Sequence, residues 1–240
     1  MLEIQPSVWI VDGNDVPFLG FAYSTRMTVI RLNDGKLWVH SPIALTPLLK
    51  EQIDQLGEVS FLIAPNHLHH LFIAEWQAQY PQALTYGTAQ VIKKRQDLRF
   101  ENSLAESATF PWDDEITHLL FTGSSVMQES VFLHKASQTL IVTDLIENFD
   151  PQRFKPLQRS IAKVVGILAP NGKMPLDWRL TFQFSKASAR EHLLTILAWQ
   201  PQRIIMAHGE IIQTDAVGFL CHSFAWLGDL TQGYGVNRPS

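Results

Sequence analysis

The chain has little cysteine and no long hydrophobic run. Its single cysteine, Cys221, excludes an internal disulfide bond, which is typical of proteins from reducing compartments. No apolar run approaches the roughly 20 residues that a membrane-spanning helix needs. Residues 1–6 have neither the basic start nor the apolar centre of a secretory signal peptide. We therefore expect a cytoplasmic protein.

An excess of positive charge is also missing. The 240 residues include 19 Lys and Arg against 23 Asp and Glu, which gives a formal net charge of −4. Proteins that bind nucleic acids usually carry a basic face, and peripheral membrane proteins often carry a basic cluster. The composition therefore predicts neither a nucleic acid nor a membrane as a partner. It gives no indication of an oligomeric state.

The length and the hydrophobic content are those of one large domain. With 46% hydrophobic residues, a chain of this length can bury roughly 70–75% of the surface that it exposes when unfolded. We found no internal repeat, low-complexity segment or linker. We therefore predict a single domain over residues 1–230, followed by a C-terminal tail over residues 231–240.

The order of expected strands and helices is typical of an α/β protein. Asn33-Asp34-Gly35 between two β-branched runs predicts a hairpin, and Thr46 before a run of helical periodicity predicts an N-cap. Strands are expected over residues 7–11, 27–32, 36–40, 59–64, 84–86, 117–122, 129–134, 139–143 and 203–207, and helices over 44–56, 71–80, 89–94, 188–199 and 214–227. The proline-interrupted segment 145–185 gives no clear pattern. Two groups of strands, each followed by helices, predict a four-layer αββα sandwich.

Polar clusters follow three of the expected buried strands. These clusters are His67-x-His69-His70, Asp144 and His208-Gly209-Glu210. Functional sites in α/β proteins collect in the loops at such strand ends. Imidazole nitrogens and carboxylate oxygens are ligands of zinc, iron and manganese. The pattern indicates one divalent metal ion, with zinc preferred over iron or manganese, or no metal if the histidines are structural.

The order and spacing of these clusters resemble the metallo-β-lactamase superfamily. That family is an αββα sandwich with a Thr-His-x-His-x-Asp-His loop after a buried strand, a later aspartate at a strand end, and a final histidine often followed by glycine. Asp144 resembles the metal-bridging aspartate, and His208 resembles the final histidine. The segments Arg26-Met27, His40-Ser41-Pro42 and Pro65-Asn66 further resemble a divergent branch of the superfamily, the DUF4336 group.

The histidine loop departs from the family motif and can be aligned with it in two ways. If His67 and His69 form the first His-x-His pair, the Asp-His pair of the motif is missing. If His70 is the last histidine, His67 is the second one, His69 replaces the aspartate and Pro65 replaces the first histidine. We prefer the second alignment because the strand and the helix then meet the loop without a gap. Serine also replaces the family's later histidine near residues 123–125.

The resemblance implies a metal-dependent hydrolase with a reduced set of ligands. One ion bound by loop histidines, Asp144 and His208 would leave a position for water, whose pKa the ion lowers toward about 7. Such a site could hydrolyse an ester, thioester, lactone or phosphoester in a small-molecule substrate. His40 or Glu210 is the predicted general base. Arg26 is predicted either to contact an anionic substrate or to form a structural ion pair, with Asp177 as the candidate partner.

A second function is compatible with the same residues. The chain could have kept the fold and lost the metal, in which case it is a non-catalytic binding or interaction protein with structural histidines. Metal content separates the two hypotheses.

Overall fold

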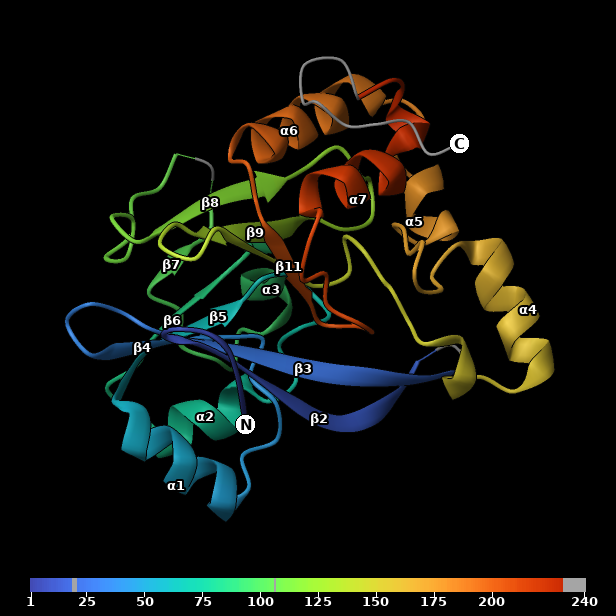
Figure 1. Ribbon diagram of the computed structural model, residues 1–240. Coiled ribbons are helices and arrows are strands. Elements are labelled where there is room, and N and C mark those ends of the chain that lie inside the picture. Colours follow the sequence, from blue (N-terminus) through green and yellow to red (C-terminus); the bar gives the residue numbers. More distant parts are fainter. Residues whose placement is uncertain (19–20, 106, 231–240) are drawn as a thin grey trace. The chain divides into compact units, whose positions relative to one another are not determined.

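The computed structural model describes residues 1–18, 21–105 and 107–230 (Figure 1). The chain forms two compact units, an N-terminal unit over Met1–Glu115 and a C-terminal unit over Ile116–Ser240. Each unit contains one sheet with its own helices. The expected tail over residues 231–240 lies outside the described residues, and the single domain over residues 1–230 stays a prediction.

The N-terminal unit contains a seven-stranded sheet in the order β1-β2-β3-β4-β5-β6-β7. Its strands are β1 (Leu2–Gln5), β2 (Val8–Phe18), β3 (Phe21–Arg31), β4 (Lys36–His40), β5 (Glu58–Ala64), β6 (Leu84–Gly87) and β7 (Asn102–Ser103). The first four strands pair antiparallel, and β4 to β7 pair parallel. The carboxyl ends of β4 and β5 therefore meet at one edge, which is where the histidine loop begins.

The hairpin of β2 and β3 is longer than the sequence predicts. Strands were expected over 7–11 and 27–32, whereas each of these strands spans 11 residues. The added residues are polar or mixed and lack an apolar alternation, so the local pattern gives no signal. They are extended because each strand supplies the other's hydrogen bonds, and Asp12 faces Arg26 directly across the pair.

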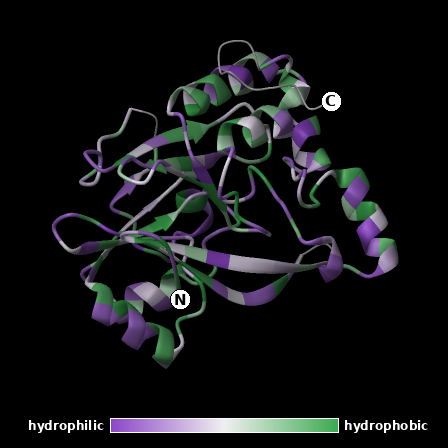
Figure 2. Ribbon diagram, viewed as in Figure 1, coloured by the Kyte–Doolittle hydropathy of each residue, from purple (hydrophilic) through white to green (hydrophobic). Residues whose placement is uncertain are grey.

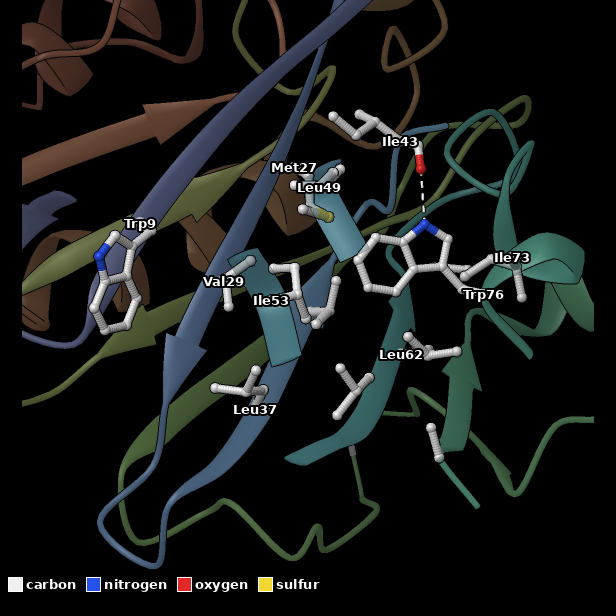
Figure 3. Packing of buried hydrophobic residues seen from close by; sticks show 14 of the residues in the cluster. Trp9, Met27, Val29, Leu37, Ile43, Leu49, Ile53, Leu62, Ile73 and Trp76 are labelled. Atoms are coloured by element: carbon white, nitrogen blue, oxygen red, sulfur yellow. Dashed lines mark hydrogen bonds between the residues drawn. The ribbon is translucent and has the colours of Figure 1, made fainter. Parts of the chain in front are cut away.

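Three helices pack their buried side chains into one cluster on one face of the N-terminal sheet: α1 (Pro47–Leu56), α2 (Ile73–Gln79) and α3 (Ala89–Lys94). The Thr46 side chain accepts a hydrogen bond from the Leu49 amide, which confirms the predicted N-cap. The buried cluster in Figure 3 includes Leu49 and Ile53 from α1 and Trp76 from α2. The Trp76 indole donates to the Ile43 carbonyl at 2.7 Å, which anchors α2 to the chain before α1.

Aromatic side chains cover the other face of the same sheet. The Trp112 ring lies 4.9 Å from the Phe61 ring, 5.1 Å from Phe110 and 6.2 Å from Trp38, measured between centroids. The polar segment after α3 thus returns across the sheet and buries it on this side. His40, the last residue of β4, stacks on Trp38 at the edge of this aromatic cluster.

The C-terminal unit contains a four-stranded sheet in the order β11-β10-β9-β8. Its strands are β8 (Ile116–Phe121), β9 (Glu129–His134), β10 (Thr139–Val142) and β11 (Arg203–Met206). The helices are α4 (Pro156–Val165), α5 (Leu176–Leu180), α6 (Lys186–Ala198) and α7 (Ala216–Ser223), with short 3-10 turns at Pro151–Arg153 and Ala225–Leu227. Only β10 and β11 pair in parallel, so their carboxyl ends lie side by side.

Two helices occupy the segment that gave no clear pattern. Both α4 and α5 lie between residues 145 and 185; α4 begins with Pro156, whose fixed backbone suits a helix start, and α5 directly follows Pro175. None of the helices in the described parts of the chain is long and apolar enough to cross a membrane.

Candidate metal site

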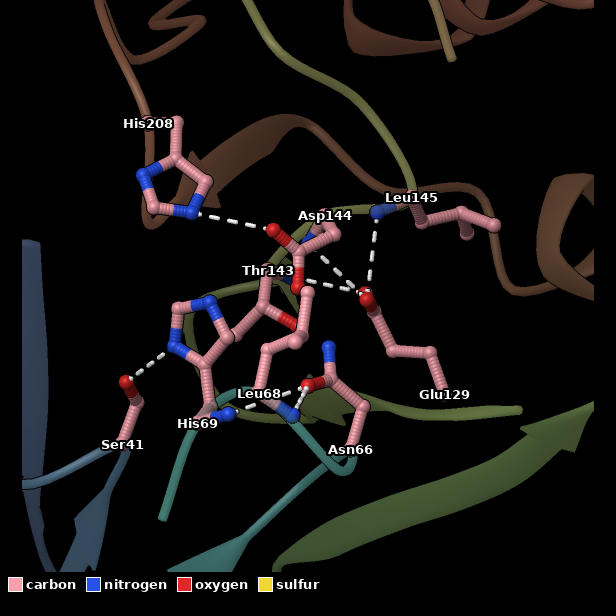
Figure 4. Close-up of polar contacts among 9 residues, drawn as sticks. All are labelled: Ser41, Asn66, Leu68, His69, Glu129, Thr143, Asp144, Leu145 and His208. Carbon is pink, nitrogen blue, oxygen red and sulfur yellow. Dashed lines mark hydrogen bonds and ion pairs between the residues drawn. The ribbon is translucent and has the colours of Figure 1, made fainter. Parts of the chain in front are cut away.

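The histidine loop joins β5 to α2 in the N-terminal unit. The buried Asn66 organises it, because its side-chain oxygen accepts hydrogen bonds from the Leu68 amide at 2.8 Å and the His69 amide at 3.1 Å (Figure 4). This is the turn that an asparagine side chain forms with the backbone two or three residues ahead. It fixes where each of the three following histidines leaves the chain.

His69 has a ring nitrogen suited to a metal. Its Nδ1 lies 2.7 Å from the hydroxyl of Ser41, the residue after β4 (Figure 4). When Nδ1 donates its proton to this hydroxyl, Nε2 keeps the lone pair that a metal ion takes. A hydrogen bond from the second ring nitrogen is a regular feature of metal-binding histidines, because it fixes the tautomer and the ring orientation.

His70 and His67 have different surroundings. The Arg95 guanidinium lies 3.0 Å from Nδ1 of the buried His70, and since arginine only donates, Nδ1 accepts and the neutral ring carries its proton on Nε2. Burial and the cations Lys94 and Arg95 lower the pKa of His70 to about 4. Coordination by Nε2 would require this ring to leave Arg95. His67 is half-buried, and its carbonyl accepts a hydrogen bond from Lys94. Their assignment as ligands stays a prediction.

His40 and Arg26, the predicted general base and substrate contact of the N-terminal unit, also have defined partners. His40 is buried with its ring 5.4 Å from Trp38, and burial together with the nearby His69 lowers its pKa well below the usual 6.5. It is therefore neutral at pH 7 and a weak base. The Arg26 guanidinium donates to the Asp12 carboxylate at 2.7 Å across the β2–β3 hairpin.

Asp144 and His208 meet in the C-terminal unit, 64 residues apart in the sequence. The His208 Nε2 lies 3.0 Å from the Asp144 Oδ1, and both residues are buried (Figure 4). They follow β10 and β11, and the parallel register pairs Val142 with Met206 and so brings the two following turns to the same level. The sequence places each residue at a strand end, and the strand pairing brings them together.

Glu129 holds the Asp144 turn and was not identified from the sequence. Its fully buried carboxylate accepts three backbone hydrogen bonds, from Thr143 at 2.7 Å, Asp144 at 2.8 Å and Leu145 at 3.1 Å (Figure 4). These bonds hold the turn that follows β10 against Glu129, the first residue of β9. The available signal was an acidic residue opening a strand that is otherwise largely apolar.

The His208 turn is held by a second set of contacts. Asn148 donates its amide to the His208 carbonyl at 3.1 Å, and its carbonyl accepts from the Glu210 amide at 2.8 Å. Gly209 between them has φ +97, and a Cβ there would collide with the Asn148 carbonyl. The Phe149 ring stacks on the His208 ring. Glu210, the other predicted general base, has an exposed side chain.

The Asp144–His208 pair has the chemistry and the spacing of two metal ligands. Ligand atoms about 2.1 Å from a tetrahedral zinc ion lie about 3.4 Å from each other. The observed 3.0 Å between Nε2 and Oδ1 differs from this by only a few tenths of an ångström. Nitrogen and carboxylate oxygen are ligands that zinc, iron and manganese accept. The residues of this unit therefore fit a divalent ion.

A protein-family model of a domain of unknown function, DUF4336, matches residues 6–160. The match covers more than half of the chain and includes the histidine loop and Asp144. The chain belongs to the DUF4336 family. His208 lies beyond the matched residues, and no curated protein matches the chain.

Solved metallo-β-lactamases have the same fold as this DUF4336 protein. The DIM-1 metallo-β-lactamase exposed to ceftazidime has a TM-score of 0.65 at 16% identity, with 94% of each chain covered. A metallo-β-lactamase from Hirschia baltica has a TM-score of 0.61 at 13% identity, covering 94% of this chain and 95% of its own. The mono-zinc form of FIM-1 from Pseudomonas aeruginosa has a TM-score of 0.59 at 11% identity, with 91% of each chain covered.

These matches confirm the predicted fold class and the resemblance read from the sequence. The DUF4336 chain has the α/β fold of the metallo-β-lactamases, with two sheets and their helices. At such low identities the likeness concerns the fold, and the reaction has to be argued from the residues of this chain.

Proposed function

We propose that this DUF4336 protein binds one divalent metal ion through His69, Asp144 and His208 and hydrolyses a small-molecule substrate. The observation that carries the proposal is the buried Asp144–His208 pair at the ends of two parallel strands. His69 contributes the third ligand atom, the Nε2 that its contact with Ser41 leaves available. Three protein ligands and one open position are typical of a catalytic zinc site.

The surroundings of each ligand support metal binding over a purely structural role. Glu129 fixes the Asp144 backbone, and Ser41 fixes the tautomer of His69, so both ligands are oriented by a second residue. Such outer contacts are usual around metal ligands and raise the affinity of the site. The mono-zinc form of FIM-1 is an example of this fold with a single zinc ion.

Each residue of the proposed site has a separate role in hydrolysis. A bound divalent ion supplies a Lewis acid and lowers the pKa of a water molecule. Asp144 contributes the negative charge that offsets the ion, and the two imidazoles remain neutral ligands. The low pKa of the buried His40 makes it a weak general base, and the carboxylate of Glu210, the other predicted base, is exposed to solvent. Arg26 would meet an anionic substrate only by sharing its contact with Asp12.

Metal content and affinity test the proposal. Protein purified without an affinity tag should carry about one equivalent of zinc, iron or manganese, and His69→Ala, Asp144→Ala and His208→Ala should each lose it. His222→Ala, a histidine of α7, is the matched control and should keep the metal. Ser41→Ala should weaken binding by about 10- to 100-fold without abolishing it.

Hydrolysis is tested separately on the loaded protein. A panel of ester, thioester, lactone and phosphoester substrates should reveal one class whose turnover is lost on chelation and in Asp144→Ala. Metal bound at full occupancy with no turnover on any class would contradict the hydrolytic part alone.

The 3.0 Å contact between Asp144 and His208 also supports a second candidate, a non-catalytic protein in which the two residues satisfy each other. In that case the purified protein is metal-free, and added zinc leaves its melting temperature unchanged. A ligand that binds only the folded state must raise that temperature, so this result would contradict metal binding.

A further inference from the structure

Helices α4 and α5 of the C-terminal unit, together with the turn after α5, expose an unusual number of large hydrophobic side chains. We call this surface the α4–α5 face, and its members are Leu157, Ile161, Val164, Leu176, Leu180 and Phe184. Figure 2 shows hydrophobic and hydrophilic residues interleaved along both helices. Leu157 and Val164 are each 75% exposed, and Phe184 is 96% exposed. Six such residues within 28 positions differ from the scattered exposure that is normal on a protein surface.

The exposed residues of α4 form one stripe along the helix. Leu157, Ile161 and Val164 stand at positions i, i+4 and i+7, so they project from the same side. Ala162, on a different side, is the buried residue that packs the helix against the unit. The helix therefore packs one face against the core of its own unit and exposes a second, apolar face.

The two helices hold this surface in place. The Arg179 guanidinium of α5 donates to the carbonyl of Val165, the last residue of α4, at 3.2 Å. Gly166 ends α4 in the left-handed conformation with its amide bonded to the Ala162 carbonyl. The Arg179 contact thus fixes the C-terminal end of α4 against α5.

The same segment is strongly basic. Residues 151–190 contain eight Lys and Arg and one acidic residue, Asp177, whereas the other 200 residues contain 11 basic and 22 acidic residues. The eight basic residues are Arg153, Lys155, Arg159, Lys163, Lys173, Arg179, Lys186 and Arg190. The whole-chain charge of −4 conceals this asymmetry, because the acidic excess of the remainder exceeds the basic excess of the segment. An anionic partner would complement the local positive charge of this segment.

We propose that the α4–α5 face docks this protein on an anionic lipid surface. A helix with a narrow apolar stripe on one side and lysine and arginine on the other is the pattern of helices that lie in a membrane interface. The apolar side chains would enter the boundary of the lipid chains, and Arg159 and Lys163 would reach the phosphate groups with their long stems packed along the helix. A symmetric contact with a second copy fits less well, because it would bring two basic segments together.

This docking is peripheral and goes beyond the proposed hydrolysis. It also revises the expectation of no membrane partner, which was drawn from the charge of the whole chain. Binding of this kind needs no spanning helix, and none of those described could span.

Co-sedimentation of the full chain with lipid vesicles tests the proposal. Vesicles of about three parts phosphatidylcholine to one part phosphatidylglycerol should bind the protein, and vesicles of phosphatidylcholine alone should not. Raising the salt concentration from about 0.1 M to about 0.5 M should release most of it, because salt screens the attraction. Leu157→Gln and Phe184→Ser should each weaken binding by about tenfold, and Lys163→Gln should weaken it by about fivefold.

Matched variants on the N-terminal unit separate docking through the α4–α5 face from non-specific adsorption to the vesicles. Leu48 is 66% exposed on α1, and Lys93 is exposed on α3, so Leu48→Gln and Lys93→Gln remove the same kinds of side chain elsewhere. Both should leave vesicle binding unchanged. All of these positions are on the surface, so the variants should remain folded.

Three results would overturn the proposal. The first is no binding to the anionic vesicles at low salt, and the second is an equal loss in Leu48→Gln and Leu157→Gln. The third is a dimer, measured by light scattering, that Leu157→Gln converts to a monomer, since the face would then join two copies of the chain. Vesicle binding is scored without activity, so its failure leaves the proposed metal site unaffected.

Discussion

Replacing Glu129 by glutamine should destabilise the protein more than any ordinary surface substitution. The carboxylate is fully buried and accepts hydrogen bonds from the amides of Thr143, Asp144 and Leu145. Glutamine has nearly the same size but offers one oxygen instead of two. Its NH₂ group must therefore face at least one backbone N–H, and a donor then meets a donor.

The magnitude follows from these three bonds. Glutamine would place its oxygen where Oε2 accepts two amides and would leave the Thr143 amide unsatisfied. A buried amide without a partner costs about 1–3 kcal/mol, and the two remaining bonds lose the added strength of a charged acceptor. Removing a buried charge offsets part of this loss. We expect the free energy of unfolding to fall by about 2–4 kcal/mol in total.

Urea unfolding monitored by tryptophan fluorescence measures this change. Glu51→Gln on α1 is the matched control, because that side chain is exposed, and it should change stability by less than about 0.5 kcal/mol. Equal stability of the two variants would refute the assigned role of Glu129. Zinc affinity, measured on the same variant, should fall by about 10- to 100-fold, since Asp144 is then less well positioned.

Three further predictions concern the backbone, the core and pH. Gly209→Ala should destabilise the protein more than Gly35→Ala in thermal unfolding, because both have positive φ but only the first adds a steric clash. Trp76→Phe should cost about 1–3 kcal/mol in urea unfolding, because it leaves the buried Ile43 carbonyl without its donor. Burial lowers the pKa of His134, so the folded state binds its proton less readily than the unfolded state; stability should fall as pH drops below about 6.5. His134→Gln should show a shallower fall between pH 7.5 and 5, and an identical slope would contradict this.

The sequence predicted much of the fold correctly because the signals are local. The apolar run over residues 59–64 became β5, and the helical spacing after Thr46 became α1 with the expected cap. A period of hydrophobic residues, a cap and a turn each involve neighbours in the chain. The extended hairpin of β2 and β3 was missed because its outer residues are held by a partner strand rather than by their own pattern.

The segment of α4 shows a different reason for failure. Leu157, Ile161 and Val164 have a clear helical spacing, but four prolines between residues 145 and 185 obscured it. Even a correct helix assignment would have placed this stripe in the core, since apolar stripes usually face inward. Its exposure could be recognised only from the folded unit.

The sequence by itself determined which chemical groups stand at the strand ends: three histidines in one loop, one aspartate, and a final histidine before glycine. It could not decide which of them act together or through which atom. Ser41 and His69 are 28 residues apart, and Asp144 and His208 are 64 residues apart, so their contacts depend on strand pairing. Only the tertiary structure shows that Arg95 contacts His70, that Ser41 contacts His69 and that Glu129 accepts a hydrogen bond from the Asp144 amide. A hydrogen bond forms between groups that the fold brings within about 3 Å, whatever their distance along the chain.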